Sequence, residues 1–158
     1  ASVPVIRYAK HIGASDERLY RALLVSDLVT IHQKTGIGRL SAYCGAVSAG
    51  CGAGAGIAYL LGGDYRAIAH TIVNAVAILS GTICDGAKPS CAAKIASAVE
   101  AGILGYYMYV NDQQFRGGDG IVAKGVENTI RNVGLLASQG MKQTDRVILN
   151  IMTGDQCL

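Results

Sequence analysis

The sequence predicts an all-α protein, a single-domain multi-helix bundle whose central helices are buried and rich in glycine and alanine. Apolar residues recur three or four positions apart along most of the 158 residues, and no alternating apolar–polar stretch of useful length occurs. The chain has only two prolines and one phenylalanine and lacks tryptophan, so its core must consist of small and aliphatic side chains. This length suits one domain with its own core, residues 1–158.

The first predicted helix begins at Ser15 or Asp16 and ends at Gly36. Leucines and an isoleucine repeat at helical spacing between these points, which predicts one apolar face. Acidic residues lie in the first turn, and His32 and Lys34 lie in the last turn, where each sign of charge complements the helix dipole.

The next two predicted helices lie in segments that carry almost no charge. Residues 43–61 contain four glycines at alternate positions. Each would weaken an isolated helix by about 1 kcal/mol relative to alanine, so the pattern indicates a buried helix with close neighbours. Asp64 caps the following helix, which ends near Ser80.

The uncharged stretches 40–63 and 67–84 are long enough to span a bilayer, but they lack flanking basic clusters and aromatic belts, so we expect no membrane partner.

The second half of the chain predicts three further elements and one loop. Pro89 suits the first position of a helix that runs towards Val110. Residues 111–120 are polar and rich in glycine, and we expect them to form a loop near the mouth of an active site. A helix follows over residues 122–137, and Thr144 caps the last helix.

Net charge and cysteine content limit the class of protein. The net charge is +3 and the basic residues are scattered, so we expect no nucleic-acid partner. Five cysteines are an odd number, and no signal peptide opens the chain, which favours a reducing, cytoplasmic setting. Because the chain begins without methionine, we expect a fragment of a longer protein.

The stretch from Cys84 to Cys91, Cys-Asp-Gly-Ala-Lys-Pro-Ser-Cys, concentrates polar groups between two apolar segments, and Cys44 lies 40 positions before it. A turn that leads into a helix N-terminus offers N–H groups and a partial positive charge, which favour a thiolate or an anionic iron–sulfur cluster. Zinc fits less well because the chain has no Cys-x2-Cys pair. On spacing alone, cysteines in such a pattern are more often small buried apolar groups than metal ligands.

Two stretches resemble a known family. Tyr43-Cys44-Gly45-Ala46 and residues 79–88, Leu-Ser-Gly-Thr-Ile-Cys-Asp-Gly-Ala-Lys, are similar to iron–sulfur-dependent L-serine dehydratase alpha chains and the related L-cysteine desulfidases. Weaker similarity covers residues 118–122 and 134–137, and the likeness extends from about position 34 to position 152. Members of this family are larger, so the resemblance implies the C-terminal, helical, cluster-binding part.

The resemblance implies a lyase with an oxygen-sensitive [4Fe–4S] cluster held by Cys44, Cys84 and Cys91 and one iron open to substrate. The implied reaction is β-elimination from a small amino acid, which gives pyruvate and ammonia, and sulfide as well from cysteine. The implied base lies in the N-terminal remainder of the enzyme, which we expect as a partner. The 158-residue chain alone is therefore expected to be inactive.

Several residues keep two interpretations. Lys88 and Asp85 are candidate catalytic residues that either contact substrate or fix the turn. We assign Cys51 to a helix interior. We assign Cys157 to a disordered tail, and the alternative that the resemblance implies is a C-terminal cysteine bound to the open iron. His70 shares a helix face with the residue four positions later, and we expect a buried histidine with its hydrogen bonds satisfied.

A protein of another class competes with the lyase. The chain could be a non-catalytic helical interaction domain whose buried cysteines are structural. The apolar run at residues 106–110, Tyr-Tyr-Met-Tyr-Val, is a candidate homodimer interface under either interpretation.

Overall fold

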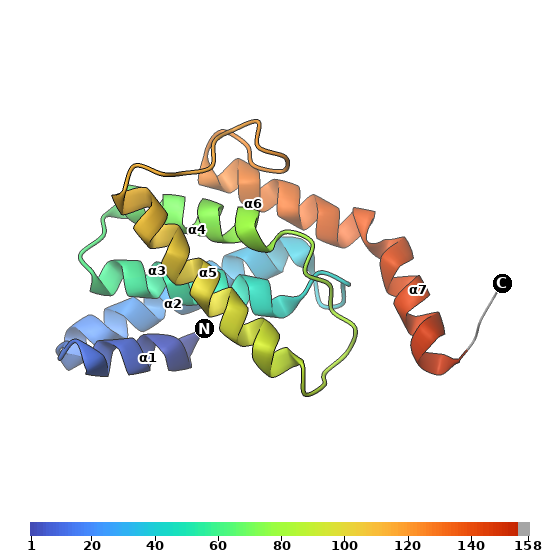
Figure 1. Cartoon of the computed structure of the whole chain (residues 1–158), viewed down its shortest axis with the longest axis horizontal. Helices are drawn as coiled ribbons and strands as arrows, with labels where there is room; N and C mark the ends of the chain where they lie inside the picture. Colours follow the sequence, from blue (N-terminus) through green and yellow to red (C-terminus); the bar gives the residue numbers. More distant parts are fainter. Residues whose placement is uncertain (155–158) are drawn as a thin grey trace.

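The computed structural model describes residues 1–154, and over this range the chain is all-α, as predicted (Figure 1). In these residues the only β-type pairing is an isolated bridge between Tyr43 and Ile83. The helices are α1 (Ser2–His11), α2 (Asp16–Ile37), α3 (Gly45–Leu60), α4 (Tyr65–Leu79), α5 (Cys91–Val110), α6 (Val126–Leu135), the π-helical segment η1 (Leu136–Gly140) and α7 (Lys142–Thr153).

Helix α3 lies at the centre of the bundle, and its glycines bring two neighbouring helices close. Gly50 and Gly54 face α5, where a Cβ added at Gly54 would lie 2.6 Å from the Cα of Gly102. Gly52 and Gly56 face backbone oxygens of α2. Positions four apart share a helix face, so one pair of glycines contacts α5 and the other pair contacts α2. The predicted buried, glycine-rich central helix is confirmed, and no helix in residues 1–154 combines the length and hydropathy needed to cross a membrane.

Helix boundaries depart from the prediction at several points. Helix α1 has no counterpart in the sequence-based prediction. Helix α2 continues past Gly36 to Ile37 and ends at Gly38, whose φ of +90° requires glycine. Helix α5 begins at Cys91 and not at Pro89, because Ser90 is its N-cap.

The last two helices also begin at other positions than predicted, α6 later and α7 earlier. Helix α6 starts at Val126, after Gly125 with a φ of +90°, so residues 122–125 belong to the preceding loop. It then passes into η1, and α7 follows Met141, which places Thr144 inside the helix and not at its cap.

Only part of the apolar face predicted for α2 packs on the core, where Leu19 and Leu23 are partly buried. Leu24, Leu28 and Ile31 are 60–62% exposed, whereas Ala22 and Ser26 are fully buried. Small side chains face α3 because the glycines of α3 admit a close approach. Three of the large apolar residues of α2, Leu24, Leu28 and Ile31, are consequently left on the surface.

Helix α7 projects from the body of the molecule at the end of the chain that the structure describes (Figure 1). None of its 12 residues is buried. Ile148 packs against the main core, and the side chain of Met152 lies close to Gly86. This helix therefore flanks the turn that contains Asp85 and Lys88.

Candidate metal centre

A tight turn at the end of α4 reverses the chain ahead of Cys84. Ser80 has φ −57° and ψ 128°, Gly81 has φ +100°, and the N–H of Thr82 donates to the Leu79 oxygen at 3.1 Å. These values are typical of a type II turn, which favours glycine at its third position. The Leu-Ser-Gly-Thr sequence thus directs the following residues back towards the start of α3.

The reversed segment pairs with the residues that precede α3. The N–H of Cys44 donates to the Thr82 oxygen at 3.1 Å, and the N–H of Cys84 donates to the Ala42 oxygen at 2.6 Å. Cys44 is the N-cap of α3 and is buried, and Cys84 is half-buried against the same core. Backbone pairing therefore brings together two cysteine segments that are 40 positions apart.

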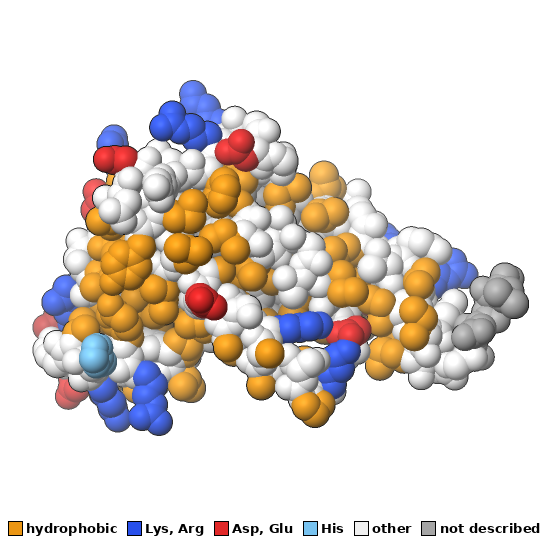
Figure 2. Space-filling view, in the orientation of Figure 1, with side chains coloured by type: hydrophobic (Ala, Val, Ile, Leu, Met, Phe, Trp, Pro, Cys, Tyr) orange, Lys and Arg blue, Asp and Glu red, His pale blue; other side chains and the backbone are white. Residues whose placement is uncertain are grey.

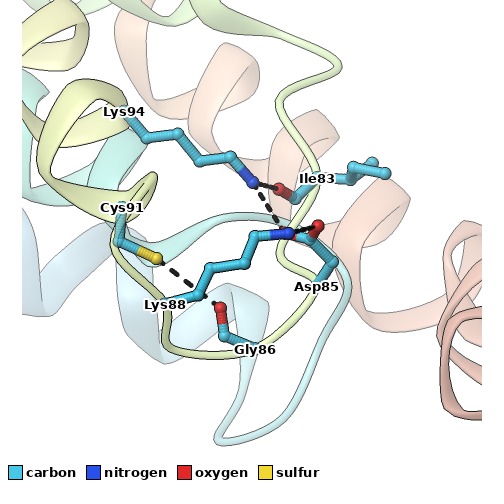
Figure 3. Close-up of polar contacts among 6 residues, drawn as sticks. All are labelled: Ile83, Asp85, Gly86, Lys88, Cys91 and Lys94. Atoms are coloured by element: carbon cyan, nitrogen blue, oxygen red, sulfur yellow. Dashed lines mark hydrogen bonds and ion pairs between the residues drawn. The ribbon is translucent and has the colours of Figure 1, made fainter. Parts of the chain in front are cut away.

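Cys91 is the first residue of α5, and its thiol donates to the Gly86 oxygen at a sulfur–oxygen distance of 3.5 Å (Figure 3). Gly86 has a φ of +89°. The N–H groups of Cys91 and Ala92 donate to the oxygens of Lys88 and Pro89 at 2.9 and 3.1 Å. The expectation that this helix start offers free N–H groups is wrong for these two, because the turn itself accepts their hydrogen bonds.

Asp85 lies between Lys88 of the same turn and Lys94 of the first turn of α5 (Figure 3). One carboxylate oxygen forms an ion pair with Lys88, and the other lies 2.8 Å from the Nζ of Lys94. Lys94 also donates to the Ile83 oxygen at 2.8 Å. Two positive charges and one negative charge leave the turn with one net positive charge, which suits an anionic ligand.

A cavity of about 540 Å³ separates this turn from α7. Its polar side chains are Asp85 and Lys88, and the other wall is apolar. Its lining residues are Ile83, Asp85, Gly86, Ala87, Lys88, Ile148, Ile151 and Met152. The two candidate catalytic residues therefore border a space large enough for a small molecule.

The three cysteines of the resemblance suit an iron–sulfur cluster by their chemistry. Cys44, Cys84 and Cys91 form no disulfide, and soft thiolates are the usual ligands of such clusters. Residues 1–154 contain no group of three or more histidine, cysteine, aspartate or glutamate side chains arranged to hold one metal ion. A cluster binds its thiolates through different irons, so this finding does not test the ligand set, which stays a prediction.

Cys51 differs from these three cysteines. It lies in the interior of α3 with no exposed surface, as expected, and burial raises the pKa of its thiol to about 12. A thiol that stays protonated at neutral pH is a poor metal ligand. Cys157 lies outside the described residues.

Lys94, in the first turn of α5, is a residue of the candidate site that the sequence-based reasoning missed. It follows Cys91 by three positions, which places both on one face of the first turn of α5. A lysine in the first turn opposes the helix dipole, so its presence there signals an acidic partner nearby. That partner is Asp85.

Comparison with known proteins agrees with the resemblance. The serine dehydratase alpha chain family matches residues 2–150. A UPF0597 protein of Desulfitobacterium hafniense is 69% identical over 157 residues, which are 99% of this chain and 36% of that protein. A UPF0597 protein of Treponema denticola is 52% identical over 154 residues, 98% of this chain and 36% of that protein.

The chain thus spans about 36% of the length of these two curated relatives. No solved structure matches it. The family match covers nearly all of the described residues, including the turn with Cys84 and Cys91. The chain belongs to the serine dehydratase alpha chain family.

Proposed function

We propose that the chain is the cluster-binding helical part of an amino-acid β-eliminating lyase, which acts on L-serine or L-cysteine. Cys44, Cys84 and Cys91 would hold a [4Fe–4S] cluster, and the products would be pyruvate and ammonia, with sulfide from cysteine. The observation that supports this most strongly is the backbone pairing of the Cys44 and Cys84 segments, which joins the two stretches of the resemblance at one place. Family membership supports the reaction class.

The residues of the turn have distinct roles in this proposal. When bound, a cluster with one open iron supplies a Lewis acid for the carboxylate and the leaving hydroxyl or thiol of the substrate. Lys88, at the edge of the cavity, attracts the substrate carboxylate, and Asp85 holds the Lys88 and Lys94 ammonium groups in place. Ile151 and Met152 of α7 form the apolar wall on the other side of the cavity.

The base that removes the α-proton is assigned to the remainder of a longer enzyme. The chain spans about 36% of its curated relatives, so most of their length lies outside the sequence described here. We therefore expect no pyruvate from L-serine or L-cysteine with the cluster-loaded 158-residue chain. Pyruvate release by that chain would show that its own residues supply the base.

Anaerobic reconstitution with ferrous iron and sulfide tests the cluster. The wild-type chain and Cys51→Ala should both gain iron, sulfide and visible absorption, because Cys51 lies inside α3. Cys84→Ala should lose the absorption and most of the iron. Circular dichroism of each variant separates a lost ligand from a lost fold.

Failure of the wild-type chain to take up iron would overturn the proposal and favour a non-catalytic helical interaction domain. That class has one specific supporting feature, an apolar groove on α5 (Figure 2). Ile95, Leu104 and Tyr107 are 46–52% exposed along it. In the lyase proposal the same face packs against the remainder of the enzyme or a second copy of the chain.

A further inference from the structure

The loop that follows α5 covers a second cavity, of about 680 Å³, over the first two turns of α4. Gly117 and Gly125 line it from the loop, and Arg66 and His70 line it from α4. The glycine-rich loop expected at the mouth of the active site borders this cavity and not the one beside Lys88.

Two fully buried polar side chains hold this loop in place. Asn74 accepts a hydrogen bond from the Phe115 N–H at 3.0 Å and donates to the Gly105 oxygen of α5 at 2.9 Å. At the other end, the hydroxyl of Thr129 accepts from the Ala123 N–H at 3.1 Å. A buried polar group costs stability unless it is satisfied, so this arrangement strongly specifies the loop conformation. The fold therefore fixes the loop that covers the cavity, and with it the shape of the cavity.

The polar rim of the cavity is cationic. Arg66, Arg116 and Lys124 line it, and none of the three forms an ion pair within residues 1–154. The Asp119 carboxylate, in the same loop, accepts from the backbone N–H of Arg116 at 2.6 Å. Basic side chains gather at the top of the molecule, over the loop that Figure 1 draws there (Figure 2). Three guanidinium and ammonium groups around one cavity attract an anion.

Two polar atoms in the wall of the cavity lack hydrogen-bond partners among the described residues. They are the Nδ1 of His70 and the Oε1 of Gln114, and both atoms are buried. The expectation that His70 is fully satisfied is therefore wrong. Its ring stacks on Tyr109 with centroids 4.9 Å apart, and burial and then the charge of Arg66 lower its pKa, which favours the neutral form. Because both atoms are buried, they become available to a ligand in the cavity when the imidazole ring or the amide group turns over.

We propose that the cavity between α4 and the 113–125 loop binds a small organic anion, either a carboxylate or a phosphate. Arg66, Arg116 and Lys124 neutralise the charge of this anion. Its other polar groups form hydrogen bonds with His70 and Gln114. The apolar lining, which includes Val73, Phe115 and Val126, suits a carbon skeleton of limited size. This site is separate from the cysteine turn. His70 precedes Ser80 by ten residues of helix and cap, which is about 15 Å along α4.

A titration of the iron-free chain with inorganic phosphate tests the site without involving the cysteines. Amide resonances of Gly117 and Gly125 are followed by two-dimensional NMR at constant ionic strength, and acetate replaces phosphate in a second series. We expect saturable shifts at these loop positions. Stronger binding of phosphate would assign a phosphorylated ligand, and stronger binding of acetate would assign a carboxylate.

Matched charge variants distinguish anion binding in the cavity from a general effect of the net charge of the protein. The double variant Arg116→Gln, Lys124→Gln should weaken binding at least tenfold. Lys10→Gln, Arg18→Gln removes the same charge from exposed positions on α1 and α2 and should leave the affinity unchanged. His70→Phe keeps a ring next to Tyr109, removes Nδ1 and should weaken binding severalfold. Equal weakening by both double variants, or shifts that do not saturate with either anion, would overturn the proposal.

Discussion

The crossing of α3 with α5 and the turn from Cys84 to Cys91 are stabilised in different ways. At the crossing, Gly54 and Gly102 allow two helix backbones into direct contact, and α3 is buried on almost every side. The turn is instead half-exposed, is held by ion pairs and a few backbone hydrogen bonds, and faces a helix with no buried residue. Stability is therefore concentrated in the glycine crossing, and the candidate reactive groups lie in the turn.

The difference also predicts how each region responds to substitution. Close-packed backbones cannot move apart without losing contacts along the whole interface, so added volume is costly there. Partly exposed charges interact through water, so their removal changes local electrostatics more than stability. Substitutions in the two regions should thus separate into effects on folding and effects on reactivity.

The largest expected effect is on folding, from Gly54→Ala. The new Cβ would lie 2.6 Å from the Cα of Gly102, and only backbone atoms are there to move. We expect the free energy of unfolding to fall by about 2–3 kcal/mol, although alanine is the better helix former. Chemical denaturation followed by circular dichroism measures this change.

Gly45→Ala is the matched control for this substitution. Gly45 lies in the same helix, and a Cβ there meets no atom within 4 Å. The variant should be as stable as the wild type or up to about 1 kcal/mol more stable. Equal destabilisation by both alanines would mean that helix propensity or a shared distortion, and not the crossing, sets the effect.

An alkaline pH titration should show a smaller effect that also arises in the core. Burial raises the pKa of Cys51 from 9.0 to about 12, so the unfolded chain releases this proton first as pH rises. Stability is full below pH 9 and falls between pH 9 and 12, by about 1 kcal/mol at pH 10. Burial also raises the pKa of Tyr43, which acts in the same direction.

Denaturation at pH 8 and pH 10 checks this prediction. Cys51→Ala changes the stability at both pH values, so the relevant quantity is the difference between them. That difference should shrink in Cys51→Ala and shrink further when Tyr43→Phe is added. An unchanged difference in both variants would assign the alkaline loss to other groups.

The central features of the fold could be predicted because their signals are local. Ser15 and Asp64 cap α2 and α4 through their side chains, as their residue types indicate. The alternate glycines of α3 indicated a close helix crossing before the partner was known. The orientation of α2 was not predictable in this way, because burial of Ala22 in place of Leu24 depends on which face α3 can approach.

The arrangement of the candidate site was harder to predict from local sequence patterns. Periodicity and spacing do not place Cys44 beside Cys84, since this contact depends on the reversal of the chain at Gly81 and on pairing between distant segments. Only the family resemblance grouped these cysteines. Lys94 was missed for a related reason, because its carboxylate partner lies nine positions earlier, outside the helix.

The smallest expected change in stability is in the turn, where charge and reactivity can be separated from folding. Asp85→Asn removes a carboxylate that is 30% exposed, so we expect a loss below about 1 kcal/mol that salt reduces further. The same change makes the turn more positive. Alkylation of Cys84 and Cys91 by anionic iodoacetate, relative to neutral iodoacetamide, should then rise by up to about fivefold at low salt.

Lys88→Gln should lower the same ratio, because it removes a positive charge from the turn while the ion pair of Asp85 with Lys94 remains. Peptide mass spectrometry assigns the label to each cysteine, and the ratio of the two reagents cancels changes in exposure. If Asp85→Asn and Lys88→Gln shift the ratio in the same direction, both act through loosening of the turn, and its charge does not control its chemistry. Opposite shifts with little change in stability would establish that this region, unlike the glycine crossing, is organised by charge.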